Sequence, residues 1–78
     1  MKLPRTVSGE RLIAILGRLG YERVRQKGSH VRVRHEGPPT HSVTIPLHDT
    51  LKAGTLHGIL SEVAVMRSIT VEELLNLL

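Results

Sequence analysis

The spacing of apolar residues near the start of the chain predicts an amphipathic helix over residues 8–19. Four residues follow the helical spacing i, i+3, i+4 and i+7, namely Leu12, Ile15, Leu16 and Leu19. Ser8 is a favourable N-cap residue in front of this stripe. Gly20 follows it, at the position where a left-handed residue commonly ends a helix. We therefore expect the first helix to end before Gly20.

Three segments with period-two alternation predict β-strands over residues 21–26, 30–35 and 41–45. Lys27-Gly28-Ser29 predicts a tight turn between the first two strands. Pro38 and Pro39 indicate a loop before the third strand, since proline cannot donate to a sheet ladder, and Pro46 ends that strand. Because the connections are short, we expect an antiparallel meander.

The two faces of this predicted sheet differ in character, because alternate residues of a strand share a face. One face is apolar and is expected to pack against the first helix; its members are Val24, Val31, Val33, Val43 and Ile45. The other face is polar and is expected to be solvated, as is common in antiparallel sheets. Its members are Arg23, Arg25, His30, Arg32, Arg34, Ser42 and Thr44.

Two further helices are predicted in the last third of the chain, after a connection over residues 47–53. Thr55 begins an apolar helical stripe formed by Leu56, Ile59, Leu60, Val63 and Ala64. Thr70 and Glu73 have the spacing of a capping box, which opens a short last helix through Leu78. Its four leucines are too many for one narrow stripe, so they either pack onto the domain or contact a partner. The order α-β-β-β-α-α predicts an α+β two-layer domain.

Length and composition limit the class of protein. Seventy-eight residues are expected to form one domain, 1–78, with a modest core. The absence of cysteine excludes disulfides and thiolate zinc sites, which favours an intracellular, cytoplasmic protein. Residues 1–5 lack the apolar region of a signal peptide, and no apolar run approaches the roughly 18 residues of a membrane-spanning helix. We therefore expect no membrane association.

The charge of the chain favours a polyanionic partner such as nucleic acid. The formal net charge is +4 and the pI is about 10.4. Arginines outnumber lysines eight to three, which suits phosphate because the guanidinium fork matches its geometry. Tyr21 is the only aromatic residue apart from the histidines, so extensive base stacking is excluded. If the protein binds RNA, it must do so mainly through phosphates, sugar hydroxyls and shape.

The strongest candidate for chemistry is His30, which begins the second strand immediately after the Lys27-Gly28-Ser29 turn. A histidine, whose unperturbed pKa is about 6.5, can remove the proton of an RNA 2′-hydroxyl near neutral pH. Arginines of the same face can hold the scissile phosphate, either Arg32 and Arg34 or Arg23 and Arg25 on the neighbouring strand. Ser29 either donates a hydrogen bond or caps the turn.

The other four histidines are weaker candidates. His48 is either a second acid or base or a structural loop residue, whereas His35 and His41 are expected to flank the second hairpin in solvent. His57 is expected to be exposed on a helix. No His-x-x-x-His pair exists, and no histidine is next to a carboxylate in a known ligand pattern, so we expect no metal site and no cofactor.

These motifs, taken together over residues 8–65, resemble the HicA family, the mRNA interferase toxins of type II toxin–antitoxin modules. In chain order they are Gly20-Tyr21, Arg25-Gln26-Lys27-Gly28-Ser29-His30, Pro46-Leu47-His48, and Lys52-Ala53-Gly54-Thr55-Leu56 with Ile59-Leu60. The resemblance implies a fold similar to a double-stranded-RNA-binding domain (dsRBD), α-β-β-β-α. Residues 66–78, the expected C-terminal helical extension, lie past the matched part, so the resemblance implies no role for them.

The resemblance also implies a function. It implies metal-independent endoribonuclease activity toward mRNA, with His30 as the catalytic residue, and a HicB-type antitoxin as partner. We expect the substrate to contact Lys27, Gly28, Ser29, Arg23, Arg25, Arg32, Arg34 and His48. Two other readings stay open at this point. The chain can be a non-catalytic RNA-binding module of the double-stranded-RNA-binding type, or a domain whose basic face binds an acidic protein.

Overall fold

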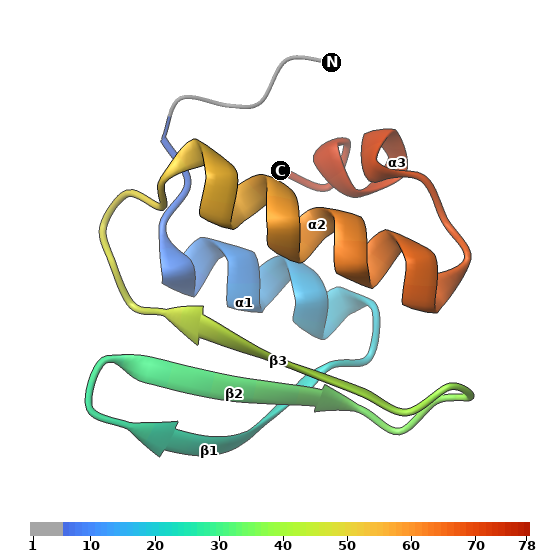
Figure 1. The fold of residues 1–78 in the computed structure, drawn as a ribbon, viewed down its shortest axis with the longest axis horizontal. Coiled ribbons are helices and arrows are strands. Elements are labelled where there is room, and N and C mark those ends of the chain that lie inside the picture. Colours follow the sequence, from blue (N-terminus) through green and yellow to red (C-terminus); the bar gives the residue numbers. More distant parts are fainter. Residues whose placement is uncertain (1–5) are drawn as a thin grey trace.

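A computed structural model describes residues 6–78. Residues 1–5, which were expected not to form a signal peptide, lie outside the described residues. The order of its elements agrees with the expected α-β-β-β-α-α order (Figure 1). They are α1 (Gly9–Arg18), β1 (Glu22–Lys27), β2 (His30–His35), β3 (His41–Pro46), α2 (Ala53–Arg67) and α3 (Val71–Leu75).

The three strands form one antiparallel sheet in the order β1-β2-β3, with β2 in the centre. Figure 1 shows α1 and α2 on the same side of this sheet, with α3 beside the C-terminal half of α2. The predicted α+β class and the dsRBD-like α-β-β-β-α arrangement are therefore confirmed. The sheet face that is turned away from the helices is left open.

The core lies between the sheet and the helices. Val31 and Val33 of β2 are 0% and 1% exposed, and both helices contribute fully buried leucines. Leu74 of α3 is also fully buried in the same cluster, and Leu75, Leu77 and Leu78 pack against it. Of the two alternatives for the leucine-rich tail, the structure therefore supports packing onto the rest of the fold.

The local signals that bound the helices act as expected. The Ser8 side chain accepts a hydrogen bond from the Arg11 amide at 3.0 Å, and Thr70 accepts one from the Glu73 amide at 3.0 Å. Gly20 follows α1 with a φ of 106°. Several limits differ from the predictions by a few residues. Helix α1 is one residue shorter at each end than the predicted 8–19, β1 lies one residue later than 21–26, and β3 extends through Pro46. Helix α2 begins two residues before Thr55, and the last helix ends at Leu75, three residues before the chain end.

Strand β1 departs from the prediction because it contains a β-bulge. The register with β2 shifts between Arg23 and Arg25, so that Arg23 is opposite Val33 whereas Arg25 is opposite Arg32. Cross-strand partners share a face, so Arg23 and Arg25 lie on opposite faces of the sheet. The predicted common face for these two arginines is therefore wrong. Val24, which was expected in the core, is 53% exposed at the bulge.

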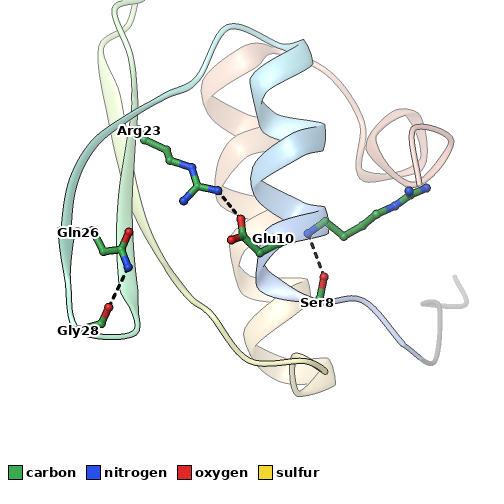
Figure 2. Close-up of polar contacts among 6 residues, drawn as sticks. Ser8, Glu10, Arg23, Gln26 and Gly28 are labelled. Carbon is green, nitrogen blue, oxygen red and sulfur yellow. Dashed lines mark hydrogen bonds and ion pairs between the residues drawn. The ribbon is translucent and has the colours of Figure 1, made fainter.

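Arg23 instead lies on the side of the sheet that carries the helices. Figure 2 shows its guanidinium reaching toward α1, where it forms an ion pair with the Glu10 carboxylate. All six residues of β1 are exposed, because this edge strand extends beyond the area that the helices cover. The Arg23–Glu10 pair therefore links an otherwise uncovered strand to α1.

The start of α1 is in close contact with the end of β3. The Gly9 amide donates a hydrogen bond to the His48 carbonyl at 3.0 Å. A Cβ atom on Gly9 would lie 2.0 Å from the Pro46 carbonyl oxygen and 3.1 Å from the Leu47 Cα. Only glycine fits this position, and the contact matters for the neighbouring strand because Pro46 is the cross-strand partner of His30.

We therefore predict that Gly9→Ala destabilises the fold. Backbone atoms of β3 must move to admit the methyl group, and overpacking of this kind costs about 1–3 kcal/mol of unfolding free energy. The matched control is Gly17→Ala in the same helix, where an added Cβ has no neighbour within 4 Å. The control should be neutral or stabilising by up to about 1 kcal/mol. Denaturant unfolding of both variants measures the difference, and equal stabilities would contradict the prediction.

Candidate nucleic-acid interface

The position of His30 is set by a two-residue hairpin loop, Gly28-Ser29. Lys27 and His30 are cross-strand partners on either side of this loop, and Gly28 has a φ of 57°, where glycine is favoured in such loops. The Gln26 side-chain amide donates to the Gly28 carbonyl at 3.1 Å (Figure 2). The predicted turn and the start of β2 at His30 are therefore confirmed.

The loop is also held from the other side of β2. The Leu47 amide, just past the end of β3, donates to the Ser29 carbonyl at 2.7 Å. The loop that precedes His30 is thus hydrogen-bonded on one side to Gln26 of β1 and on the other to Leu47, the residue after β3. The backbone of His30 is therefore held in place by the loop, although its imidazole side chain is exposed to solvent.

A pocket with a volume of about 230 Å³ lies on the open face of the sheet at this end. Its lining residues are Arg25, Lys27, His30, Arg32 and Thr44. The strand register explains this set: it places Lys27 opposite His30, and it places Arg25 and Thr44 on either side of Arg32. Residues from all three strands therefore surround one hollow.

The lining of this pocket is suited to an anion. It contains three permanent cations and no acidic residue. Arg25 and Arg32 are directly opposite each other, an arrangement of like charges that is unfavourable in a sheet unless an anion lies between them. None of the ion pairs among residues 6–78 involves Arg25, Lys27 or Arg32. A phosphate group would supply the missing counter-charge.

The remaining predicted site residues are distributed around this pocket. Gly28 and Ser29 form the loop at its edge, and Arg34 lies on the same face one cross-strand row farther along β2. His48 is exposed beyond β3 and does not line the pocket. Arg23 lies on the opposite face, so the structure does not bring it to this pocket.

The histidines at the other end of the sheet are not solvated as predicted. His41 is only 6% exposed, and both of its ring nitrogens are bonded: Nδ1 to the Tyr21 hydroxyl at 2.7 Å and Nε2 to the Glu62 carboxylate at 2.8 Å. His35 is half-buried, and its Nδ1 accepts a hydrogen bond from the Gly37 amide at 2.8 Å. The expectation that His41 is solvated is therefore wrong.

Arg67 of α2 completes this buried polar cluster. Its guanidinium bonds to His35 and to the Pro39 carbonyl, and it lies 5.8 Å from the centre of the Tyr21 ring. The cluster joins the C-terminal part of α2 to the end of the β2–β3 hairpin. Its members are up to 46 positions apart in sequence, so only the tertiary fold brings them together; the one local signal was the unusual pair of histidines flanking the loop.

Tyr21 is occupied by this cluster and cannot stack on a base. It is 3% exposed, and its hydroxyl bonds to His41. Burial raises the pKa of Tyr21 above its ordinary value of 10.0 and the Glu62 charge adds to this rise, while Arg67 opposes it. The open face of the sheet therefore has no Tyr, Phe or Trp side chain on which a base could stack.

Another hollow in the described part of the chain differs in character from the pocket around His30. A larger hollow of about 590 Å³ lies at the start of α1, where Arg11 and Asp49 of opposite charge both line it, and it contains no histidine. Within residues 6–78, no three His, Asp or Glu side chains are grouped in a way that could hold a metal ion. In the same part of the chain, none of the helices has the length and apolarity needed to cross a membrane.

We predict that the single tyrosine makes folding stability sensitive to high pH. A phenol whose pKa is raised by folding stays protonated after the unfolded chain has ionised. The free energy of unfolding should therefore be unaffected below pH 10 and fall as the pH rises from 10 through the raised pKa of Tyr21. Because the chain has one tyrosine, tyrosinate absorbance reports this pKa directly.

Tyr21→Phe is the matched variant for this prediction. It leaves the buried His41 Nδ1 without its hydrogen-bond partner, so the free energy of unfolding should fall by about 1–3 kcal/mol at neutral pH. It should also remove the tyrosine-dependent part of the loss at high pH. A tyrosinate titration at the ordinary pKa, or a variant with an unchanged pH profile, would contradict this account.

Comparison with known proteins places the chain in a family. The family model described as the HicA toxin of bacterial toxin–antitoxin modules matches residues 9–65, from the start of α1 to near the end of α2. No curated protein and no solved structure matches the chain. The matched range is more than half of the 78 residues and includes every residue of the pocket around His30. The chain therefore belongs to the HicA toxin family.

Proposed function

We propose that this HicA-family toxin is a metal-independent endoribonuclease that cleaves mRNA in the pocket around His30. The observation that carries the proposal is the combination of one titratable imidazole with three unpaired cations, Arg25, Lys27 and Arg32, in a hollow on an exposed sheet face. A group that can move a proton is thus next to groups that can bind a phosphate.

The choice of His30 over the other histidines rests on its free ring nitrogens together with its place in the pocket. A general base needs a nitrogen that is not already bonded, and both nitrogens of His41 are bonded. His35 Nδ1 accepts hydrogen bonds from its neighbours. Among residues 6–78, no side-chain hydrogen bond involves His30, and it is the only histidine that lines the pocket.

The proposed reaction is an internal transesterification. The free imidazole nitrogen of His30 accepts the proton of a ribose 2′-hydroxyl, and the 2′-oxygen attacks the adjacent phosphorus. The bond from phosphorus to the 5′-oxygen of the next nucleotide breaks, and that oxygen takes a proton from water or from protonated His30. Arg25, Lys27 and Arg32 stabilise the negative charge that develops on the phosphoryl oxygens. The products are a 2′,3′-cyclic phosphate and a 5′-hydroxyl end.

The other expected contact residues have different parts in this proposal. The Gly28-Ser29 loop positions His30, and its exposed backbone lies next to the substrate. Arg34 lies on the same face, outside the pocket. Arg23 and His48 do not line the pocket, so we assign them no contact with the scissile phosphate.

The protein partner that we propose is a HicB-type antitoxin, consistent with a toxin of a toxin–antitoxin module in the cytoplasm, where mRNA is found. An exposed face with unpaired cations attracts acidic side chains, and such complementarity speeds association. Carboxylates of the antitoxin placed over Arg25 and Arg32 would occupy the phosphate positions. Inhibition would then be direct exclusion of RNA.

We predict that His30→Ala abolishes RNA cleavage. The variant removes the base, a loss of about 10²–10⁴-fold, without touching the core, so the melting temperature should change little. The matched control is His57→Ala, an exposed histidine of α2 outside the pocket, which should cleave at the wild-type rate. Cleavage of labelled RNA by the three proteins, side by side, measures the effect.

The same assay separates the alternatives. Full activity of His30→Ala would refute the proposed base. Salt-sensitive RNA binding by a wild type that never cleaves would instead select a non-catalytic RNA-binding module. If the protein neither cleaves nor binds RNA, the result would favour the third alternative, a domain whose basic face binds an acidic protein.

We also predict that cleavage needs no metal ion, since the imidazole and cations supply the base and the charge stabilisation. Excess EDTA should leave the rate unchanged, and the products should carry 5′-hydroxyl and cyclic or 3′-phosphate ends. End-labelling before and after phosphatase treatment identifies these ends. Products with a 5′-phosphate, or activity lost with the chelator, would rule out the mechanism.

A further inference from the structure

The charge of the open sheet face changes along β2. Near the Gly28-Ser29 loop, two cross-strand rows contain three cations and no carboxylate. Their other members are His30, Thr44 and Pro46. The next row toward the other end of β2 contains Glu22, Arg34 and Ser42. An acidic residue therefore lies on this face one row beyond the pocket. This is a consequence of the bulge, which places Glu22 on the open face and Arg23 on the opposite one.

A second carboxylate lies at the same end. Glu36 follows β2 directly, and its Oε1 lies 3.4 Å from the Arg34 Nε. Its side chain is 82% exposed, so its charge is presented to solvent at the edge of the face. One arginine is thus accompanied by two carboxylates, which gives this end of the face a net negative charge.

This charge change has a direct consequence for a polyanion. Residues two apart on a strand are about 7 Å apart, which is within the Debye length of about 10 Å at moderate salt. An RNA strand that ran from the pocket along β2 would bring its next phosphate toward Glu22 and Glu36. The Nε of Arg34 already lies beside the Glu36 carboxylate, so the charge of Glu36 offsets the attraction of Arg34 for that phosphate.

We propose that Glu22 and Glu36 form an electrostatic boundary, which limits RNA contact on the sheet to the single phosphodiester held in the pocket and directs the strand away from the Arg34 end. This inference rests on the proposed function, because it concerns the substrate of the same pocket. The flanking nucleotides then leave over the loop end of the face. Arg34 serves to hold Glu36 at the boundary and is not a phosphate site in the wild type.

The test compares two substrates and two matched double variants. The substrates are a dinucleoside monophosphate, which has one phosphate, and a long single-stranded RNA. Glu22→Gln with Glu36→Gln removes the boundary at constant side-chain size. Glu72→Gln with Glu73→Gln, two exposed glutamates of α3, makes the same change in net charge away from the face. Equilibrium binding and KM are measured for each protein as a function of salt.

The expected result is specific to the long substrate. At low salt, the boundary variant should bind long RNA more tightly by about three-fold for each carboxylate removed, as expected for unit charges about 7 Å apart in water. Wild type should show a log–log salt slope of about −0.7, for the one phosphate held in the pocket, and the boundary variant a slope steeper by about 0.7 as a second phosphate reaches Arg34. The dinucleotide and the α3 variant should show no change.

Three results would overturn the boundary. One is an unchanged affinity and slope of the boundary variant on long RNA; another is an equal gain by the α3 variant, which would show an effect of net charge alone. The third is an equal gain on the dinucleotide. If wild type cleaves neither substrate, the proposed ribonuclease function fails, but the binding measurements still decide whether the boundary exists.

Discussion

The fold and the site both depend on the alternating burial of the central strand. Val31 and Val33 are closed off from solvent in the core, while His30, Arg32 and Arg34 between and beside them are exposed. A slip of one residue in the pairing of β2 would exchange these sets and place arginines against leucines, at a large desolvation cost. The burial of two valines therefore fixes which face carries the histidine. The two-residue loop and the Leu47–Ser29 bond fix where along the sheet it lies.

The exposed cations illustrate a division between stability and function. Arg23 and Arg34 have carboxylate partners, Glu10 and Glu36, and both pairs lie at the margins of the sheet. The three cations of the pocket have no such partner among the described residues, although an acidic neighbour would relieve their mutual repulsion. Surface ion pairs contribute only about 0–1 kcal/mol each, so the fold loses little by leaving these cations unpaired. Because no carboxylate neutralises these cations, they can attract an anion from outside the protein.

The sequence was most informative where a structural feature has a local cause. The caps at Ser8 and Thr70, the Gly28-Ser29 loop and the alternation of β2 each depend on neighbouring residues, and all of them agree with the structure. The β-bulge was not predictable from the sequence. The alternation of residue types in the Tyr21–Lys27 segment does not show at which residue the pairing shifts, and the shift is visible only in the register of β1 with β2. Arg23 was therefore assigned to the wrong face. Lys27 was expected to contact the substrate and Thr44 to lie on the polar face, but the sequence did not indicate that both line one hollow with His30.

The five histidines show why residue type alone did not identify the site. His35 and His41 are cross-strand partners at one end of the β2–β3 ladder, and His30 is at the other end. At the first end, α2 covers the sheet and supplies Glu62 and Arg67, so the imidazoles become donors and acceptors of a buried network and are not available to a substrate. His30 lies on the opposite, open face of the sheet, and among residues 6–78 no side-chain hydrogen bond involves its ring. The same side chain thus holds the fold together on the face that a helix covers and stays exposed on the face that no helix of the described residues covers. Coverage by α2 is a tertiary property, and it decides which of these three histidines is exposed.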